Sequence, residues 1–238
     1  MYEFKIKIER KIEMHNWQIK INKNECLNVK VEVVFNSKFS KEEMQEIQKL
    51  YDNQNKKINF KEKVKVNGIY HKNRTKLIAS WQSKSKQSEN ALGFIMFNPS
   101  FANPENSDDT IRNAIKFANQ EGYNKIVVFN LFPIRISGAD FVCKCYKKDF
   151  LKEYECEIDF DDLPNDVVLC WGKLPRKIPY IDKIIDNLYS TLKEKQKNLY
   201  QITDDTFQRH LSSPSINSIK GISQLRLTEI KSIYKFNN

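Results

Sequence analysis

The sequence of 238 residues contains only six glycines, and they form neither a G-x-x-x-x-G-K-[ST] loop nor a G-x-G-x-x-G loop. Both loops bind phosphates through backbone N–H groups, so their absence argues against the common classes of nucleotide-binding enzyme. No run of about 18 apolar residues is present, so we expect no membrane-spanning helix. The N-terminal residues lack the apolar core of a signal peptide, and the expected location is therefore the cytoplasm.

Cysteine spacing does not predict a metal site. The chain has five cysteines, and no pair shows the C-x-x-C spacing that zinc and iron–sulfur sites favour. Cys143, Cys145, Cys156 and Cys170 could still be interpreted as an irregular ligand set. Cys170 lies in an apolar run, however, and is more simply a core residue. We therefore expect no metal and no other cofactor.

Positive charge is what the sequence has in excess. Forty Lys and Arg residues against 30 Asp and Glu give a net charge of +10 and a pI near 9.2. Such an excess favours a polyanionic partner, most often nucleic acid. An AT-rich genome, whose codons favour Lys, Asn and Ile, produces the same excess without such a partner. Charge alone leaves both interpretations open.

The first third of the chain has the pattern of a small α+β segment. Apolar and charged residues alternate as in half-buried strands over 4–13, 17–22 and 29–35, and a further strand pair is expected over 58–71. Between them, Ser40 is a predicted N-cap, followed by Met44, Ile47 and Leu50 at helical spacing. Residues 1–75 contain no catalytic constellation, so we expect an accessory segment.

The remainder of the chain, residues 76–238, has the pattern of an α/β domain. Continuous apolar runs indicate strands buried on both faces over 92–97, 125–132, 166–171 and 197–203. Helical patterns alternate with these runs over 108–120, 138–152, 175–196 and 221–235. The alternation predicts a three-layer α/β/α fold with a central, mostly parallel four-stranded sheet, preceded by the smaller α+β segment.

Polar residues follow each predicted strand of this sheet. Asn98-Pro99-Ser100 follows the first strand, Asn130 ends the second, Trp171-Gly172 ends the third, and Arg209-His210-Leu211-Ser212 follows the fourth. In open α/β sheets, ligands bind in the crevice beyond the carboxyl ends of the strands. We therefore expect these four groups to form one site.

The same four groups carry a resemblance to a known superfamily. "FIMFNPS", "VVFNLFP", "VVLCWG" and "RHLSSPSINSIKG" resemble, in this order, the motifs of the uracil-DNA glycosylase superfamily over about residues 90–235. The segments "YHKNRTKLIASW", "GFIMFNPSFAN" and "DDTIRNAIKFANQEGYNKIVVFNLFPIR" are also similar to a bacterial family of unknown function. That family has the pattern I-M-L-N-P-S-T-A-D, then D-D-P-T-I-R, then V-V-N-L-F-A-x-R.

The superfamily resemblance implies a DNA glycosylase, a hydrolase that flips a nucleotide out of the stack and breaks its N-glycosidic bond. Asn98 would then position water, although an Asn-Pro pair also suits a simple turn after a strand. Pro99 would shape that turn. Asn130 would read the base edge, or be a satisfied buried amide. His210 would stabilise the leaving base anion.

Residues beside these four complete the implied site. Asp108 and Asp109 open a helix, where acidic residues cap and complement the dipole, but Asp109 could also supply a catalytic base. Phe101 would stack under the base or pack in the core. In the last loop, hydroxyl groups would hold phosphates, two basic residues would add charge, and an apolar side chain would wedge into the stack. The DNA-binding residues implied are Arg209, Ser212, Ser213, Pro214, Ser215, Ile216 and Lys220.

The substrate follows from the residue after the proline. Uracil-specific members of the superfamily carry a Tyr there, which excludes groups at C5 of the pyrimidine, whereas this chain has Ser100. We therefore expect a C5-modified pyrimidine, such as the modified cytosine of phage DNA, and a role in antiviral defence. Two alternatives remain: a catalytically inactive nucleic-acid-binding module of the same fold, or a nucleotide-processing enzyme. DNA is the expected partner, and the oligomeric state is left open.

Overall fold

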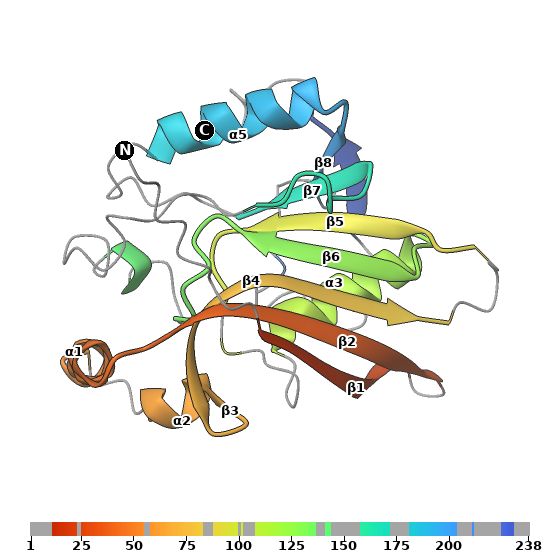
Figure 1. The fold of residues 1–238 in the computed structure, drawn as a ribbon. Coiled ribbons are helices and arrows are strands. Elements are labelled where there is room, and N and C mark those ends of the chain that lie inside the picture. The colour runs from red at the N-terminus through yellow and green to blue at the C-terminus, as the bar shows by residue number, and fades with distance from the viewer. Residues whose placement is uncertain are drawn as a thin grey trace, which may run out of the picture.

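The structure is a computed structural model, which describes residues 11–22, 25–54, 58–82, 88–99, 101, 108–136, 141–143, 158–171, 181–203, 211 and 225–230. One sheet of nine strands contains every strand of this part of the chain, in the order β1-β2-β4-β6-β5-β7-β8-β9, with β3 paired to β4 (Figure 1). The strands are β1 (Lys11–Asn22), β2 (Glu25–Lys38), β3 (Lys65–Val66), β4 (Ile69–Trp81), β5 (Ala91–Met96), β6 (Lys125–Asn130), β7 (Asp166–Cys170), β8 (Asn198–Thr203) and β9 (Arg226–Glu229). The helices are α1 (Lys41–Asp52), α2 (Phe60–Val64), α3 (Asp109–Gln120) and α5 (Ile181–Glu194).

The predicted fold class, with its mostly parallel four-stranded sheet, is wrong. The four predicted strands do pair in parallel, as β6-β5-β7-β8, but they lie within a mixed sheet whose other pairings are antiparallel. β4 joins the free edge of β6 with Leu77 opposite Val128. The alternation of apolar and polar residues in β4 predicts a half-buried strand, but it does not specify which strand will be its partner.

The other edge of the parallel strands also differs from the prediction. A helix was expected over 221–235, but Arg226–Glu229 forms β9, which pairs antiparallel with β8. Leu225 and Ile230, on either side of β9, are buried. Leu227 is partly buried and lies three residues before Ile230, which is a helical spacing, so the apolar pattern alone did not exclude a helix.

The N-terminal elements follow from local signals. Ser40 is the N-cap of α1, as predicted, and forms a capping box with Glu43. Residues Phe60–Val64 form α2 where a strand was expected, and Asn59 caps this helix. β3 and β4 form a hairpin through Asn67 and Gly68, both at positive φ. β4 spans the boundary expected near residue 75, and the division into two domains stays a prediction.

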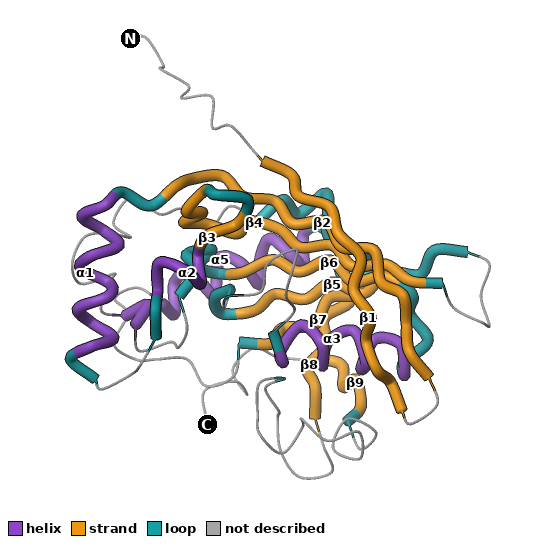
Figure 2. The backbone as a smooth tube through the Cα atoms, turned by 90° about the horizontal axis from the view of Figure 1, so that it is seen from below, coloured by secondary structure: helices purple, strands orange, loops and turns teal. Residues whose placement is uncertain are grey.

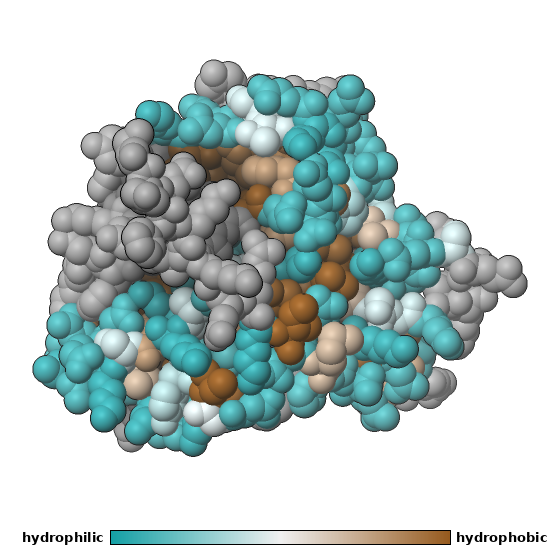
Figure 3. Space-filling model, in the orientation of Figure 1, coloured by the Kyte–Doolittle hydropathy of each residue, from teal (hydrophilic) through white to brown (hydrophobic). Residues whose placement is uncertain are grey.

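Both faces of the sheet are covered by apolar side chains. Along β5, Phe94 and Met96 belong to the cluster that includes α3, while Ile95 and Phe97 belong to the cluster that includes α1, α2 and α5. Figure 2 shows α3 lying along the sheet, with α1 and α2 at one end of it. On the face of the sheet opposite α3, hydrophobic side chains gather below α5 (Figure 3). Within the described residues, no helix is long and apolar enough to cross a membrane.

Candidate functional site

The carboxyl ends of the parallel strands and the start of β4 meet at one end of the sheet, beside α1 and α2 (Figures 1 and 2). Backbone hydrogen bonds continue past the strand ends, from Leu131 N to Met96 O and from Phe132 N to Phe97 O, both 2.9 Å. Arg74 N donates to Pro133 O at 2.9 Å. The loops after β5 and β6 are therefore held together. We call Asn98, Pro99 and Asn130 the strand-end site.

The side chain of Asn98 has a fixed orientation. Its Nδ2 donates to the carbonyl of Ile136 at 2.5 Å and to the carbonyl of Pro99 at 3.1 Å. Both of these hydrogen bonds use Nδ2 and leave Oδ1 to accept another, and the residue is only partly buried. The amide therefore presents an acceptor oxygen in a defined direction, which suits the positioning of a water molecule but not the removal of its proton.

Asn130 is the unusual residue of the strand-end site. It is 3% exposed, and neither its Nδ2 nor its Oδ1 has a hydrogen-bond partner within the described residues. Its partner in the parallel register is Met96, so it lies on the adjacent strand from Asn98. Burial of an unpaired amide costs about 1–3 kcal/mol, and an exception of this kind needs an explanation. No described contact satisfies this amide, and its role in reading a base edge stays a prediction.

Two other predicted residues have structural contacts. Asp108 caps α3 through a hydrogen bond from Ile111 N to its Oδ1, at 2.9 Å, as the capping interpretation predicts. The Asp109 side chain is 59% exposed and forms an ion pair with Arg112 one turn along α3. Its assignment as a base therefore gains no geometric support.

The neighbours of Asn98 are packed. Pro99 is buried. Phe101 is partly buried and packs edge-on against Phe60 of α2, with 6.2 Å between the ring centroids. This contact agrees with the packing interpretation of Phe101, and its predicted role in stacking under a base stays a prediction.

All seven predicted DNA-binding residues lie outside the described residues, namely Arg209, Ser212, Ser213, Pro214, Ser215, Ile216 and Lys220. The predicted base-binding Ser100 and the predicted catalytic His210 also lie outside them. Leu211 is described, and its carbonyl accepts a hydrogen bond from Asn113 Nδ2 of α3 at 2.8 Å. A backbone group of Leu211 also contacts the Cys170 thiol at the end of β7. One point of the last segment therefore lies against the ends of the parallel strands.

Cys170 is a core residue, as the sequence indicated. It is buried, and burial raises the pKa of its thiol to about 11. The thiol therefore stays protonated at neutral pH and is a poor metal ligand or nucleophile. Among the described residues, no group of three His, Cys, Asp or Glu side chains is arranged to hold a metal ion.

The sequence analysis did not identify two fully buried arginines near the strand-end site, Arg74 and Arg135. Arg135 is in the segment after β6, and its Nη atoms donate to the carbonyls of Val64 (2.9 Å), Lys63 (3.2 Å) and Phe101 (3.4 Å). Its guanidinium also lies 5.2 Å from the ring centroid of Phe35. Arg135 thus ties α2 and the loop after β5 to the end of β6.

Both guanidinium groups keep their charge at neutral pH. Burial, together with the nearby charge of Arg74, lowers the pKa of Arg135 to about 9. Burial likewise lowers the pKa of Arg74 to about 10, and the Asp108 carboxylate partly opposes that shift. The strand-end site is therefore flanked by buried positive charge. The only sequence sign of this charge was the arginine in each of the segments "YHKNRTKL" and "NLFPIR". An arginine is usually expected to be exposed, so neither was predicted to be buried.

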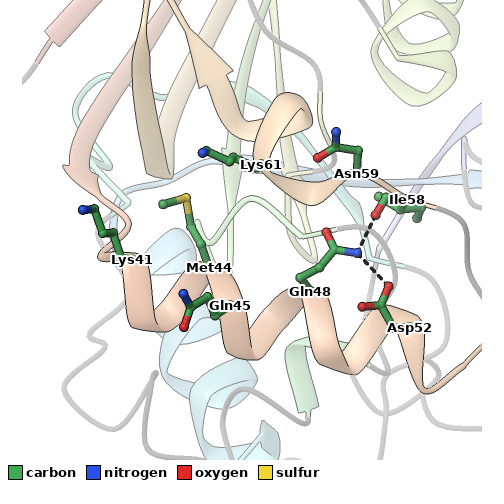
Figure 4. A pocket seen from close by; sticks show the side chains of 8 residues that line it. All are labelled: Lys41, Met44, Gln45, Gln48, Asp52, Ile58, Asn59 and Lys61. Atoms are coloured by element: carbon green, nitrogen blue, oxygen red, sulfur yellow. Dashed lines mark hydrogen bonds between the residues drawn. The ribbon is translucent and has the colours of Figure 1, made fainter.

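A cavity of about 630 Å³ lies between α1 and α2 (Figure 4), and neither Asn98 nor Asn130 lines it. Gln48 Nε2 donates to Asp52 Oδ1 and to the carbonyl of Ile58, both at 2.8 Å, while its Oε1 accepts from Phe60 N at 2.9 Å. The amide of Gln48 thus holds the two helices together. Its hydrogen bonds are structural, and we assign this cavity no ligand.

Comparison with known proteins identifies the family of the chain. The sequence profile described as "Protein of unknown function (DUF1643)" matches residues 74–214, which is more than half of the chain. The chain therefore belongs to this family. The matched range includes Arg74, Asn98, Asn130 and Arg135. No curated protein and no solved structure matches the chain.

Proposed function

We propose that this protein is a DNA glycosylase whose strand-end site receives a flipped pyrimidine. The observation that carries the proposal is Asn130, whose buried amide has an unpaired donor and an unpaired acceptor on the strand beside Asn98. A pyrimidine base presents complementary amide-like groups on its edge. Binding such a base would satisfy both atoms of Asn130 and offset the cost of burying them.

The proposed reaction is the hydrolysis of the N-glycosidic bond. Asn98 Oδ1 accepts a hydrogen bond from a water molecule, whose oxygen attacks C1′ of the sugar. The bond between C1′ and the base breaks, its electron pair leaves with the base, and the base anion takes up the proton that the attacking water releases. Nδ2 of Asn130 donates to the base edge as negative charge develops there, and the buried charges of Arg74 and Arg135 favour the anion. An amide at position 98 orients the water without deprotonating it, so the expected reaction is slow.

The resemblance to the uracil-DNA glycosylase superfamily adds a substrate preference to the proposal. Ser100 replaces the Tyr that closes the C5 side of the pocket in uracil-specific members. A C5-modified cytosine is therefore the proposed base, and phage DNA is one source of it. Removal of such bases would damage phage DNA and spare host DNA, which makes antiviral defence the proposed role.

Release of free bases from DNA tests the proposal. The full chain is incubated with single- and double-stranded oligonucleotides that each contain one uracil, 5-hydroxymethylcytosine or glucosylated 5-hydroxymethylcytosine. Mass spectrometry then measures the free base, and alkaline cleavage measures the abasic site. We expect release of a C5-modified base by the wild type, and a loss of at least about a hundredfold in Asn98→Ala.

Asn28→Ala is the matched control, because Asn28 is an exposed asparagine of β2 with Gln18 of β1 as its register partner. This variant should release base at the wild-type rate. DNA binding without release of any base would instead support the inactive binding module. Equal activity of Asn98→Ala and the wild type would exclude the proposed role of Asn98.

A further inference from the structure

A second cavity opens at the same end of the sheet, between the end of β2 and the start of β4. Its volume is about 630 Å³. The residues that line it, which define the β2–β4 cavity, are Lys11, Phe35, Asn36, Ser37, Lys38, Ile69 and His71. Apart from Lys11 of β1, they belong to β2 and β4, and Lys38 is the register partner of His71. All of them precede residues 74–214, the range of the family match.

Two polar groups of the β2–β4 cavity are buried without hydrogen-bond partners. His71 is 2% exposed, and its Nε2 has no partner within the part of the chain that the structure describes. The Oγ of Ser37 is also buried and has no hydrogen-bond partner among the described residues. His71 is held in place by stacking on Phe35, with ring centroids 4.2 Å apart and an interplanar angle of 19°. Two residues that line one cavity therefore carry polar atoms without partners among the described residues.

The charges around the cavity are predominantly positive. Lys38 is exposed and has no ion-pair partner among the described residues, whereas Lys11 contacts Glu13 at 2.6 Å. Burial lowers the pKa of His71 to about 4, helped by the positive charges of Arg135, Lys11 and Lys38 and opposed by Glu13. The imidazole is thus neutral at neutral pH, and its surroundings favour a bound anion.

We propose that the β2–β4 cavity binds a phosphate group. The Lys38 ammonium and the Ser37 hydroxyl contact its oxygens, and His71 Nε2 donates to a third oxygen. Ammonium and hydroxyl donors spread around a cavity suit a tetrahedral anion, whereas a planar carboxylate is best matched by an arginine fork. The volume leaves room for a larger molecule that carries the phosphate. The proposal stands apart from base excision, because it concerns different residues and a ligand that needs no reaction.

Nuclear magnetic resonance of the histidine rings tests the proposal directly. The chain has only three histidines, so the His71 signals can be assigned by substitution. Titration of the full chain with inorganic phosphate should give saturable shifts of the His71 ring. Sulfate stays a dianion throughout the pH range of interest, and it should raise the pKa of His71 by about one unit or more, because a bound anion stabilises the imidazolium.

Variants that each remove one polar group from the cavity separate its contributions to binding. Lys38→Gln and Ser37→Ala should each weaken phosphate binding at least about fivefold, which is the loss of one charge-assisted or neutral hydrogen bond. Lys30→Gln removes the same charge from an exposed position of β2 that lies opposite Asn16 and Ser80, and it should bind phosphate like the wild type. Absence of saturable shifts, or equal weakening in Lys30→Gln and Lys38→Gln, would overturn the proposal.

Competition identifies the source of the phosphate. Thymidine 5′-monophosphate that displaces inorganic phosphate and binds more tightly would assign the cavity to a free nucleotide. A short oligonucleotide that displaces phosphate, when the mononucleotide binds no better than phosphate itself, would assign it to the DNA backbone. Either result supports a phosphate site, and each is read without any measurement of base release.

Discussion

The amide of Asn98 is held by two backbone carbonyls, and this arrangement suits an amide and opposes a carboxylate. Asn98→Asp would place negatively charged oxygen against the carbonyls of Ile136 and Pro99, which now accept hydrogen bonds from Nδ2. We expect this variant to lose about 2–4 kcal/mol of unfolding free energy, and Asn98→Ala to lose only about 1–2 kcal/mol.

Urea denaturation of both variants at pH 7.5 provides the comparison, and Asn28→Ala serves again as the control. The expected order reflects the replacement of attraction by repulsion in Asn98→Asp. An Asn98→Asp protein as stable as the wild type would show that the carbonyls of Ile136 and Pro99 do not fix this side chain. A carboxylate that gains activity would show that the site tolerates a base there.

His71 gives the protein a pH dependence of known sign. Its pKa is about 4 in the folded chain, below the ordinary value of 6.5 that applies when the chain unfolds. As the pH falls from 6.5 to 4, the unfolded chain takes up the proton first, so folding becomes less favourable by up to about 3 kcal/mol. Above pH 6.5, His71 contributes no pH dependence.

The contribution of His71 is isolated by comparison with His71→Phe, which keeps an aromatic ring against Phe35. Carboxyl groups other than Glu13, whose charge acts on His71, titrate alike in both proteins, so the difference between their stability curves reports mainly this histidine. We expect the difference to change by about 3 kcal/mol between pH 6.5 and 4, in favour of the variant at low pH. A constant difference over that range would contradict the assignment.

At the scale of elements, Arg135 connects the N-terminal helices to the strand ends. Its three carbonyl partners belong to Lys63, Val64 and Phe101, and a lysine cannot reach all three. Arg135→Lys should therefore lower the unfolding free energy by about 2–4 kcal/mol. Arg112→Lys, in an exposed pair on α3, should change it by less than about 0.5 kcal/mol. Similar small effects in both variants would show that the hydrogen bonds of Arg135 to the three carbonyls do not stabilise the fold.

The sequence predicted elements better than their pairing. Local sequence signals were enough to predict α1, α3 and the parallel strands. Ser40 and Asp108 are the N-caps of the two helices, and continuous apolar runs indicated the strands. The position of β4 beside β6, and of β9 beside β8, depends on contacts between residues far apart in the chain. A strand pattern shows which residues are buried, but several sheet edges could accept the same strand. That is why the fold class was wrong while its central strands were found.

The candidate site was predictable in part for the same reason. Asn98 and Asn130 stand at the ends of obvious strands, so their proximity follows from the parallel pairing of β5 and β6. The buried Arg74 and Arg135 depend on β4 and α2 packing at these strand ends, which the sequence did not reveal. His71 and Ser37 likewise line a cavity only because β2 and β4 pair antiparallel.

At the scale of the whole molecule, the net charge of +10 predicts how DNA binding responds to salt. Each phosphate contact releases counterions from DNA, so several contacts give a steep decrease in affinity with salt. We expect the affinity for a 20-nucleotide DNA to fall more than about tenfold between about 50 and 200 mM NaCl. Fluorescence anisotropy measures this dependence, and an affinity that stays constant would argue against nucleic acid as the partner.

The central claim is that the unpaired amide of Asn130 is kept for a base and not for the fold. Asn130→Leu distinguishes a role in base binding from a role in folding, because leucine has a similar volume and no polar atoms to bury. The unfolding free energy and the rate of base release are measured on the same samples of wild type and variant. The account predicts a gain of about 1–3 kcal/mol in stability together with loss of base release. A variant that is less stable than the wild type, or that still releases base at the wild-type rate, would contradict it.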